Sequence, residues 1–322
     1  MTRSALLAEL EADAAFVYRT LSPTPQIAWP LLAGRAGCEV WVKHENHGPL
    51  GSFKARGGLT YVRELCASRP AVRGVVSATR GNHGQSVPFA ARRAGLEATI
   101  VVPHGNSVDK NAAIRALGAK LIEHGRDFQE AFEHAQSLAK SHDLHFFPSF
   151  HPWLVRGVST CAWELLRAQP QLDLLYVPIG LGSGVCGALR AREALGLRTR
   201  IVGVVAERAP TYALSFEAGR PVPTDSADTL ADGLAVRVPD AEALERIRAG
   251  VERVVRVSEA EIRSAMRALF SDTHNVAEGA GAAALAACLA ERGALAGQRV
   301  GVILSGGNVD RALYASVLSE KE

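Results

Sequence analysis

Short β-rich runs alternate with helical stretches along almost the whole chain of 322 residues. The runs with the composition of strands are Glu39–Lys43, Gly74–Ala78, Ala98–Pro103, Lys120–Glu123, Leu144–Phe147, Leu174–Ile179, Ile201–Ala206, Val251–Val257 and Val300–Leu304. These runs are apolar on both faces, and amphipathic helices separate most of them. Strands buried on both faces and joined by helices form parallel sheets. The alternation therefore predicts an α/β fold with helix-covered parallel sheets.

Residues that typically begin or end helices occur at the expected places. Helix N-caps are expected at Ser52, Ser107, Asp127 and Ser258, and helix ends at Gly95, Gly118 and Gly196. The segment 219–238 is poor in periodic structure and rich in Pro, Asp and Gly. We expect it to be a loop-rich excursion near a site.

The composition excludes several classes of protein. A hydrophobic fraction of 48% with 21% charged residues is typical of a globular protein with a large core, and a net charge of +3 does not favour nucleic-acid binding. The cysteines are in no metal-binding spacing and are expected to be core residues: Cys38, Cys66, Cys161, Cys186 and Cys288. No apolar run reaches the roughly 20 residues of a membrane span. A cytoplasmic protein with no membrane or nucleic-acid partner is expected.

The segment Ser52-Phe53-Lys54-Ala55-Arg56-Gly57 follows a turn and begins a predicted helix, so that Lys54 lies in its first turn. Positive charge is disfavoured at a helix N-terminus by the helix dipole. We therefore expect the pKa of the Lys54 amine to be lowered, which suits a nucleophile and base. The motif alone leaves open an ordinary lysine that is exposed to solvent.

A second motif, Thr79-Arg80-Gly81-Asn82-His83, again joins the end of a strand to the start of a helix. Free backbone N–H groups at such a place attract anions, whether a carboxylate or a phosphate. Asn82 is a candidate to hydrogen-bond a ring hydroxyl or a carboxylate. Alternatively, it only caps the helix that begins near His83.

Two glycine-containing loops follow predicted strands. The loop Gly180-Leu181-Gly182-Ser183-Gly184 opens a helix predicted over 185–195, whose N–H groups can hold a phosphate. Ser305 lies at the end of the last strand, where ligands bind in α/β sheets. Each loop alone could equally be a tight turn, and the first could belong to a dinucleotide-binding fold, although the rest of that fingerprint is not convincing.

In this order the four motifs resemble the fold type II pyridoxal-phosphate enzymes, specifically the threonine/serine dehydratase and serine racemase family. The resemblance also includes Thr24-Pro25, Ala231-Asp232-Gly233 and Asn308, and it covers most of the chain. It implies two parallel-sheet α/β domains, as in the tryptophan synthase β chain, with pyridoxal 5'-phosphate in the cleft. Residues 1–52 and 153–322 would form the large cofactor-binding domain, and residues 53–152 the small substrate-side domain. A homodimer is expected from the resemblance only.

The resemblance also implies roles for individual residues. Lys54 would carry the cofactor as a Schiff base and, once freed, take the proton from the substrate Cα. Asn82 would bond the ring hydroxyl, the glycine loop would hold the phosphate, and Ser305 would face the pyridine nitrogen. The cofactor-binding set is then Lys54, Phe53, Asn82, Gly180, Gly182, Ser183, Gly184 and Ser305. The substrate-binding set is Ser52, Thr79, Arg80, Gly81 and His83.

The implied reaction converts a β-hydroxy-α-amino acid of the L-threonine or L-serine type to a 2-oxo acid and ammonia. Ala55 stands where related synthases have an aspartate, which favours a dehydratase. Arg80 stands where racemases have a serine that transfers a proton, so serine racemisation is disfavoured. The acidic cation site of relatives is incomplete after Glu207, and no metal dependence is expected. The chain ends soon after Ser305, so no isoleucine-binding regulatory domain is expected.

Two further motifs, one containing His44 and His47 and the other His274, distinguish this chain from plain threonine dehydratases. They are similar to dehydratases of less common substrates, such as 3-phenylserine or a hydroxyectoine-pathway intermediate. These histidines could approach the substrate or be structural hydrogen-bonding residues. Two other classes stay open: an oxidoreductase that binds NAD, and a silent relative that holds the cofactor without catalysis.

Overall fold

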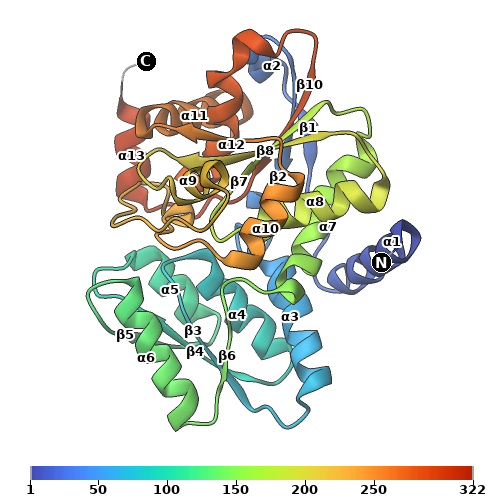
Figure 1. Cartoon of the computed structure of the whole chain (residues 1–322). Helices are drawn as coiled ribbons and strands as arrows, with labels where there is room; N and C mark the ends of the chain where they lie inside the picture. The colour runs from blue at the N-terminus through green and yellow to red at the C-terminus, as the bar shows by residue number, and fades with distance from the viewer. Residues whose placement is uncertain (1, 321–322) are drawn as a thin grey trace.

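The chain forms two lobes, each built around one β-sheet, in a computed structural model that describes residues 2–320 (Figure 1). The larger sheet has the strand order β1-β2-β10-β7-β8-β9, and the smaller one has the order β5-β4-β3-β6. The strands are β1 (Gln26–Ala28), β2 (Glu39–His44), β3 (Gly74–Ala78), β4 (Glu97–Val102), β5 (Lys120–Glu123), β6 (His145–Phe146), β7 (Leu174–Pro178), β8 (Arg200–Ala206), β9 (Arg253–Val257) and β10 (Arg299–Leu304). The larger sheet therefore takes strands from both ends of the sequence.

The strand predictions are confirmed, with boundaries that differ by at most two residues. Strand β1 was not predicted, because its three half-buried residues are too few to show a periodic pattern. It runs antiparallel to β2 at the edge of the larger sheet, whereas the other neighbouring pairs in both sheets are parallel. The predicted α/β class with parallel sheets is thereby confirmed.

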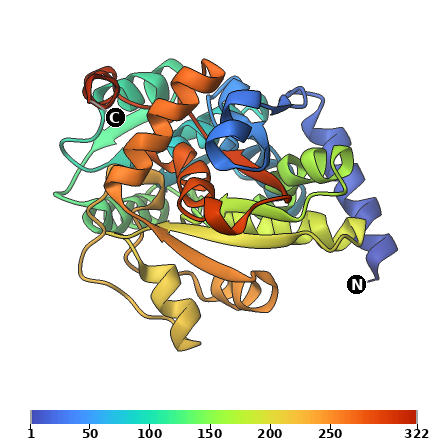
Figure 2. The same cartoon turned by 90° about the horizontal axis from the view of Figure 1, so that it is seen from above.

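Helices cover both faces of each sheet. They are α1 (Arg3–Val17), α2 (Pro30–Ala36), α3 (Lys54–Ser68), α4 (Asn82–Arg93), α5 (Val108–Ala116), α6 (Phe128–Ser141), α7 (Pro152–Ala168), α8 (Ser183–Leu195), α9 (Thr211–Ala218), α10 (Ala241–Gly250), α11 (Glu259–Thr273), α12 (Gly279–Ala290) and α13 (Arg311–Ser319), with 3-10 turns η1 (Glu45–His47), η2 (Asp232–Leu234) and η3 (Arg292–Ala294). Helix α1 lies at the outer edge beside α7 and α8 (Figure 2).

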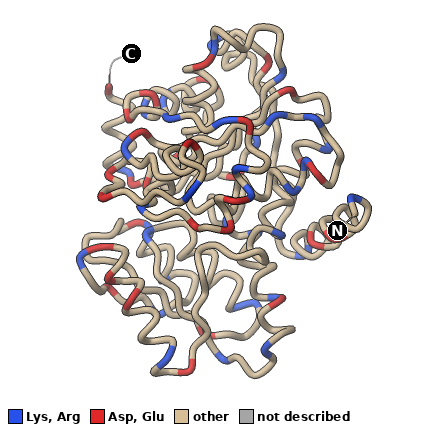
Figure 3. The backbone as a smooth tube through the Cα atoms, in the orientation of Figure 1, with Lys and Arg blue, Asp and Glu red and all other residues tan. Residues whose placement is uncertain are grey.

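The larger sheet separates two hydrophobic cores. Along β8, Val202 and Val204 pack with α2, α11, α12 and α13, whereas Ile201 and Val205 pack with α1, α7, α8 and α10. This alternation follows from the period of two along a strand. In the smaller sheet, the core on one face is shared with α3, α4 and α5, and the core on the other face with α6. Lys and Arg are intermixed with Asp and Glu over both lobes (Figure 3).

Most of the predicted helix punctuation is confirmed. The side chains of Ser107, Asp127 and Ser258 cap α5, α6 and α11, and Ser258 forms a full capping box with Glu261. Ser52 is not an N-cap, because α3 begins at Lys54 with Phe53 before it. The segment 219–238 contains only the short turn η2 as regular structure. Within residues 2–320 no helix has the length and apolar character of a membrane span.

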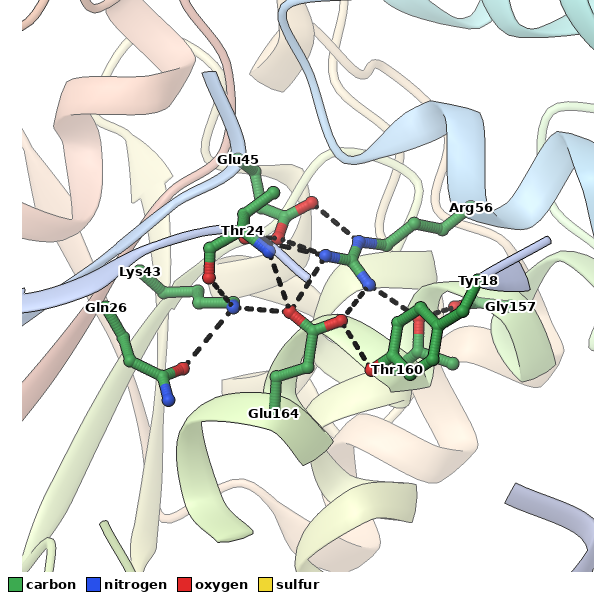
Figure 4. Close-up of polar contacts among 9 residues, drawn as sticks. All are labelled: Tyr18, Thr24, Gln26, Lys43, Glu45, Arg56, Gly157, Thr160 and Glu164. Atoms are coloured by element: carbon green, nitrogen blue, oxygen red, sulfur yellow. Dashed lines mark hydrogen bonds and ion pairs between the residues drawn. The ribbon is translucent and has the colours of Figure 1, made fainter. Parts of the chain in front are cut away.

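A buried group of charges joins α3 to the larger sheet and to α7 (Figure 4). The Arg56 guanidinium lies 2.8 Å from a Glu45 carboxylate oxygen and 2.5 Å from one of Glu164. The Lys43 amine lies 2.5 Å from the other Glu164 oxygen, and the Tyr18 hydroxyl donates to Glu164 at 2.8 Å. All four charged side chains are almost fully buried. Buried charges are tolerated only when they are completely paired, so the group requires every member.

We expect Glu164→Ala to lower the free energy of unfolding by about 3–5 kcal/mol, because it leaves Lys43 and Arg56 buried with a missing counter-charge. Urea denaturation followed by circular dichroism measures the change. The control is Glu11→Ala, since Glu11 is exposed on α1, and we expect a change within about 0.5 kcal/mol. Equal effects of the two substitutions would contradict a stabilising role for the buried charges.

Candidate active site

Backbone hydrogen bonds join the loop before Lys54 to the loop that follows β10. Ser52 and Gly306 form an antiparallel bridge, the Phe53 N–H donates to the Ser305 carbonyl at 3.1 Å, and the Gly307 N–H donates to the Gly51 carbonyl at 2.9 Å. Ser52 is thus held by backbone pairing, which explains why it does not cap the helix. Two motifs that are more than 240 residues apart in the sequence therefore meet at one place.

The Lys54 side chain reaches the glycine loop. Its Nζ lies 3.4 Å from the Ser183 hydroxyl, at the first residue of α8. Burial lowers the pKa of the Lys54 amine to about 8, and the nearby Glu278 carboxylate opposes this shift. The expected lowering of the pKa is confirmed, with burial as its main cause. The alternative of an ordinary lysine exposed to solvent is wrong.

The glycine loop is tightly packed. Gly182 has a φ of 99°, and a Cβ there would lie 2.7 Å from the Ala243 Cβ; a Cβ on Gly180 would lie 2.3 Å from the Gly233 carbonyl oxygen. Glycine is therefore required at both positions. The first N–H groups of α8 have no partner within the helix and are suited to bind an anion. A small cavity beside the loop is lined by residues that include Phe53, Gly184 and Ser305.

Asn82 is the first residue of α4 and does not cap it, because the N-cap position is Gly81. The capping alternative is therefore wrong. Its Nδ2 donates to Glu278 Oε1 at 2.6 Å, and its Oδ1 accepts from Asn308 Nδ2 at 2.7 Å. Both partners belong to segments that adjoin the Ser305 loop. Asn82 of the smaller-sheet lobe is thus held by two residues of the larger-sheet lobe.

The rest of this motif surrounds the start of α4. The Thr79 hydroxyl accepts from the N–H groups of Gly81 and Gly84, at 3.0 and 3.2 Å, and so shapes the turn. His83 is buried, and burial together with the Lys54 charge lowers its pKa to about 3, which keeps the ring neutral. Its Nε2 and the Ser52 hydroxyl are buried without a hydrogen-bond partner in the described part of the chain. Arg80 is exposed.

The structure adds residues that sequence reasoning did not assign to the site. Lys110 of α5 pairs with Asp232 of η2 and lies 3.8 Å from Glu278. Asp232 and Asn308 belong to segments that the resemblance included, and Glu278 lies four residues after His274, in the second of the histidine motifs. Lys110 is preceded by a predicted helix start at Ser107, but nothing in its local sequence indicates a partner 122 residues away.

The additional histidines form structural contacts. His44 Nε2 accepts from the Trp29 indole N–H at 2.9 Å, and His47 Nε2 lies 2.6 Å from Asn275 Oδ1. His274 is exposed and adopts a φ of 55° at the end of α11. The His47 contact connects η1 to the segment between α11 and α12, and the His44 contact connects the end of β2 to the residue before α2. They favour the structural alternative for His44 and His47.

A separate pocket of about 500 Å³ lies at the opposite ends of β7, β8 and β9. Its arginines, Arg200 and Arg253, are paired with Glu252, and Arg253 also with Glu291. None of the predicted site residues lines it. The convergence of the four motifs therefore places the candidate site at the glycine loop.

Comparison with known proteins gives consistent matches over both sheets. Residues 17–306 match the family described as pyridoxal-phosphate dependent enzyme. The L-threonine ammonia-lyase of Thermotoga maritima is 34% identical over 291 residues, which are 90% of this chain and 72% of that protein. An L-threo-3-hydroxyaspartate ammonia-lyase of Pseudomonas sp. is 35% identical over 297 residues, 92% of each chain. The structure of the processed form of threonine deaminase isoform 2 from Solanum lycopersicum superposes with a TM-score of 0.91 at 29% identity, covering 98% of this chain and 94% of that one.

We expect the Lys54 amine of the cofactor-free protein to be acetylated with a midpoint near pH 8, whereas an ordinary lysine titrates near 10.4. Brief labelling with acetic anhydride at a series of pH values, followed by peptide mass spectrometry, measures it. Lys54→Arg removes the labelled position and identifies the peptide. A midpoint above pH 10 would show that burial does not lower this pKa.

Proposed function

Because the chain belongs to the family of pyridoxal-phosphate dependent enzymes, we propose that it is an ammonia-lyase that converts a β-hydroxy-α-amino acid to a 2-oxo acid and ammonia. The similarity to L-threonine and L-threo-3-hydroxyaspartate ammonia-lyases supports this reaction. The observation that carries it is the Lys54 amine beside Ser183 at the start of α8. The family match also decides against the NAD-dependent oxidoreductase.

The residues present fit pyridoxal 5'-phosphate. An amine, a glycine loop that tolerates no side chain at Gly180 or Gly182, and the N-terminus of α8 lie together, as an aldehyde with a phosphate group requires. We assign Lys54 to the aldehyde carbon and Gly180, Gly182, Ser183 and Gly184 to the phosphate. Phe53, Asn82 and Ser305 complete the proposed cofactor contacts.

Lys54 is the proposed base. When bound, the cofactor supplies an electron sink for negative charge that develops at the substrate Cα. Since the Lys54 pKa is about 8, a useful fraction of its amine is neutral near neutral pH and can accept the Cα proton at Nζ. The Ser183 hydroxyl can then accept a hydrogen bond from the ammonium that forms.

The substrate carboxylate is proposed to bind at the start of α4. The Gly84 N–H already donates to Thr79. The N–H groups proposed to bind the carboxylate are therefore those of Asn82 and His83, the first two residues of α4, which have no partner within the helix. Ser52 and His83 have unpartnered buried polar atoms and can contact the substrate ammonium or hydroxyl. Gly81, the N-cap residue of α4, is assigned to the same carboxylate.

A substrate with an acidic side chain is the second candidate within this class. Arg80 is exposed beside the proposed carboxylate site, and one relative acts on L-threo-3-hydroxyaspartate. An arginine binds a carboxylate through two parallel hydrogen bonds. Dehydration of 3-phenylserine or of a hydroxyectoine-pathway intermediate has no such supporting contact. A cytoplasmic homodimer, with domain boundaries at residues 52/53 and 152/153, completes the proposal.

The purified protein with cofactor is expected to release ammonia from at least one of L-threonine, L-serine, 3-phenylserine and 3-hydroxyaspartate. Lys54→Ala should lower kcat on the order of 10²- to 10⁴-fold, the usual contribution of a catalytic base. Coupled ammonia assays measure both quantities, and Lys140→Ala on exposed α6 is the control. D-serine formation from L-serine serves as the racemase control. Full activity of Lys54→Ala would refute the assignment.

Arg80→Ala is expected to raise KM for 3-hydroxyaspartate on the order of 10-fold, because a charged hydrogen bond to the side-chain carboxylate is lost. KM for L-serine, which lacks that carboxylate, should change little. Steady-state kinetics with both substrates measure the ratio, and Arg80→Lys should recover part of the loss. An equal change for both substrates would contradict a role of Arg80 in selecting acidic substrates.

A further inference from the structure

Charged and amide side chains from the two lobes contact one another. From the smaller-sheet lobe come Lys110 of α5 and Asn82 of α4; from the other lobe come Asp232 of η2, Glu278 before α12 and Asn308 after β10. Lys110 pairs with Asp232 and lies 3.8 Å from Glu278 Oε2, and Asn82 contacts Glu278 and Asn308. This inter-lobe cluster includes Asn82, the first residue of α4.

The hydrogen bonds fix the orientation of the Asn82 amide. Its Nδ2 donates to Glu278 Oε1 at 2.6 Å, and its Oδ1 accepts from Asn308 Nδ2 at 2.7 Å. Asn308 is itself held, because the same Nδ2 donates to the Leu50 carbonyl at 2.7 Å. An amide nitrogen has two hydrogens. One Asn82 hydrogen therefore remains available to an acceptor on a ligand.

Glu278 is in an unusual environment for a carboxylate. Its Oε2 is buried without a hydrogen-bond partner among residues 2–320. Burial and the charge of Asp232 disfavour the ionised form, whereas Lys110, Lys54 and the Asn82 hydrogen bond favour it, and the balance raises the pKa to about 7. Lys110 is the strongest of the groups that lower the Glu278 pKa, so its loss would raise that pKa further. The charge of Glu278 therefore depends on a residue from the other lobe.

We propose that Glu278 and Lys110 are positioning residues: the Glu278 carboxylate, held by Lys110, orients the Asn82 amide so that its free N–H is available to the ring oxygen of the cofactor. The inference rests on the proposed function, since it takes Asn82 as a cofactor contact. When Glu278 is protonated, its acid hydrogen competes for the amide oxygen and the orientation is no longer enforced. Lys110 thereby couples the approach of the two lobes to the cofactor site.

The experiment measures the dissociation constant of pyridoxal 5'-phosphate for the cofactor-free full chain, by absorbance titration between pH 6 and pH 8.5. The variants are Glu278→Gln, Lys110→Met and the double variant. Glu133→Gln and Lys140→Met, both on the exposed face of α6, are the matched controls. Ionisation of the free cofactor cancels when each variant is expressed as a ratio to the unsubstituted protein. Because the Glu278 carboxylate also raises the pKa of Lys54, the series is repeated by equilibrium dialysis in a Lys54→Ala background, where that amine is absent.

We expect Glu278→Gln to weaken binding on the order of 10-fold at pH 8, because a charge-assisted hydrogen bond becomes a neutral one. At pH 6, where Glu278 is mostly protonated, the dissociation constants of Glu278→Gln and of the unsubstituted protein should become nearly equal. Lys110→Met should move the pH dependence to higher pH, because the carboxylate loses its cation. The double variant should be no weaker than Glu278→Gln alone, since the two residues act through one group.

If the dissociation constant of Glu278→Gln, divided by that of the unsubstituted protein, is the same at every pH, Glu278 has only a structural role and the inference is overturned. Additive effects of Lys110→Met and Glu278→Gln would also overturn it. Circular dichroism of each variant verifies folding before titration. A chain that binds the cofactor with the expected pH dependence but releases no ammonia would refute the proposed lyase reaction while supporting the positioning role.

Discussion

The position of Lys54 depends on a buried arginine two residues further along the same helix. Arg56 is almost completely buried and is paired with Glu45, which follows β2, and with Glu164 of α7. Desolvation of these charges is offset only while the pairing is complete, so the start of α3 has one stable position relative to the larger sheet. The bridge between Ser52 and Gly306 fixes the same turn from its other side. Ion pairing and backbone pairing together place the amine beside Ser183.

The same exclusion of water that makes this pairing obligatory also determines the chemistry of the Lys54 amine. The helix dipole acts on any lysine in a first turn, but its effect on an exposed amine is small. Here burial is the main cause of the lowered pKa, and the Glu278 carboxylate limits the shift. Reduced contact with water thus has opposite consequences for two neighbouring cations, the fully buried Arg56 and the half-buried Lys54. It leaves the paired Arg56 charged and makes the poorly paired Lys54 easier to deprotonate.

Much of the fold could be predicted because strand signals are local. An apolar run such as Gly74–Ala78 is bounded by its own sequence, whereas the three residues of β1 become a strand only by pairing with β2. Ser52 shows how tertiary contacts override a local preference, since its backbone pairs with Gly306 and its side chain caps nothing. Lys110 and Asp232 are 122 residues apart, and neither has a local pattern that reveals the other. Sequence motifs therefore indicated Lys54, Asn82, the glycine loop and Ser305, but not the groups that join the two lobes around them.

Some buried polar atoms around Lys54 have no hydrogen-bond partner in the described part of the chain. Each buried polar atom without a hydrogen bond costs about 1–3 kcal/mol. Of the 11 buried side-chain atoms without a hydrogen-bond partner among residues 2–320, three belong to segments around Lys54: the Ser52 hydroxyl, His83 Nε2 and Glu278 Oε2. A ligand that supplies the missing partners recovers this free energy on binding. The site around Lys54 is therefore less stable alone than a fully satisfied core would be, and that deficit becomes part of the affinity for whatever occupies it.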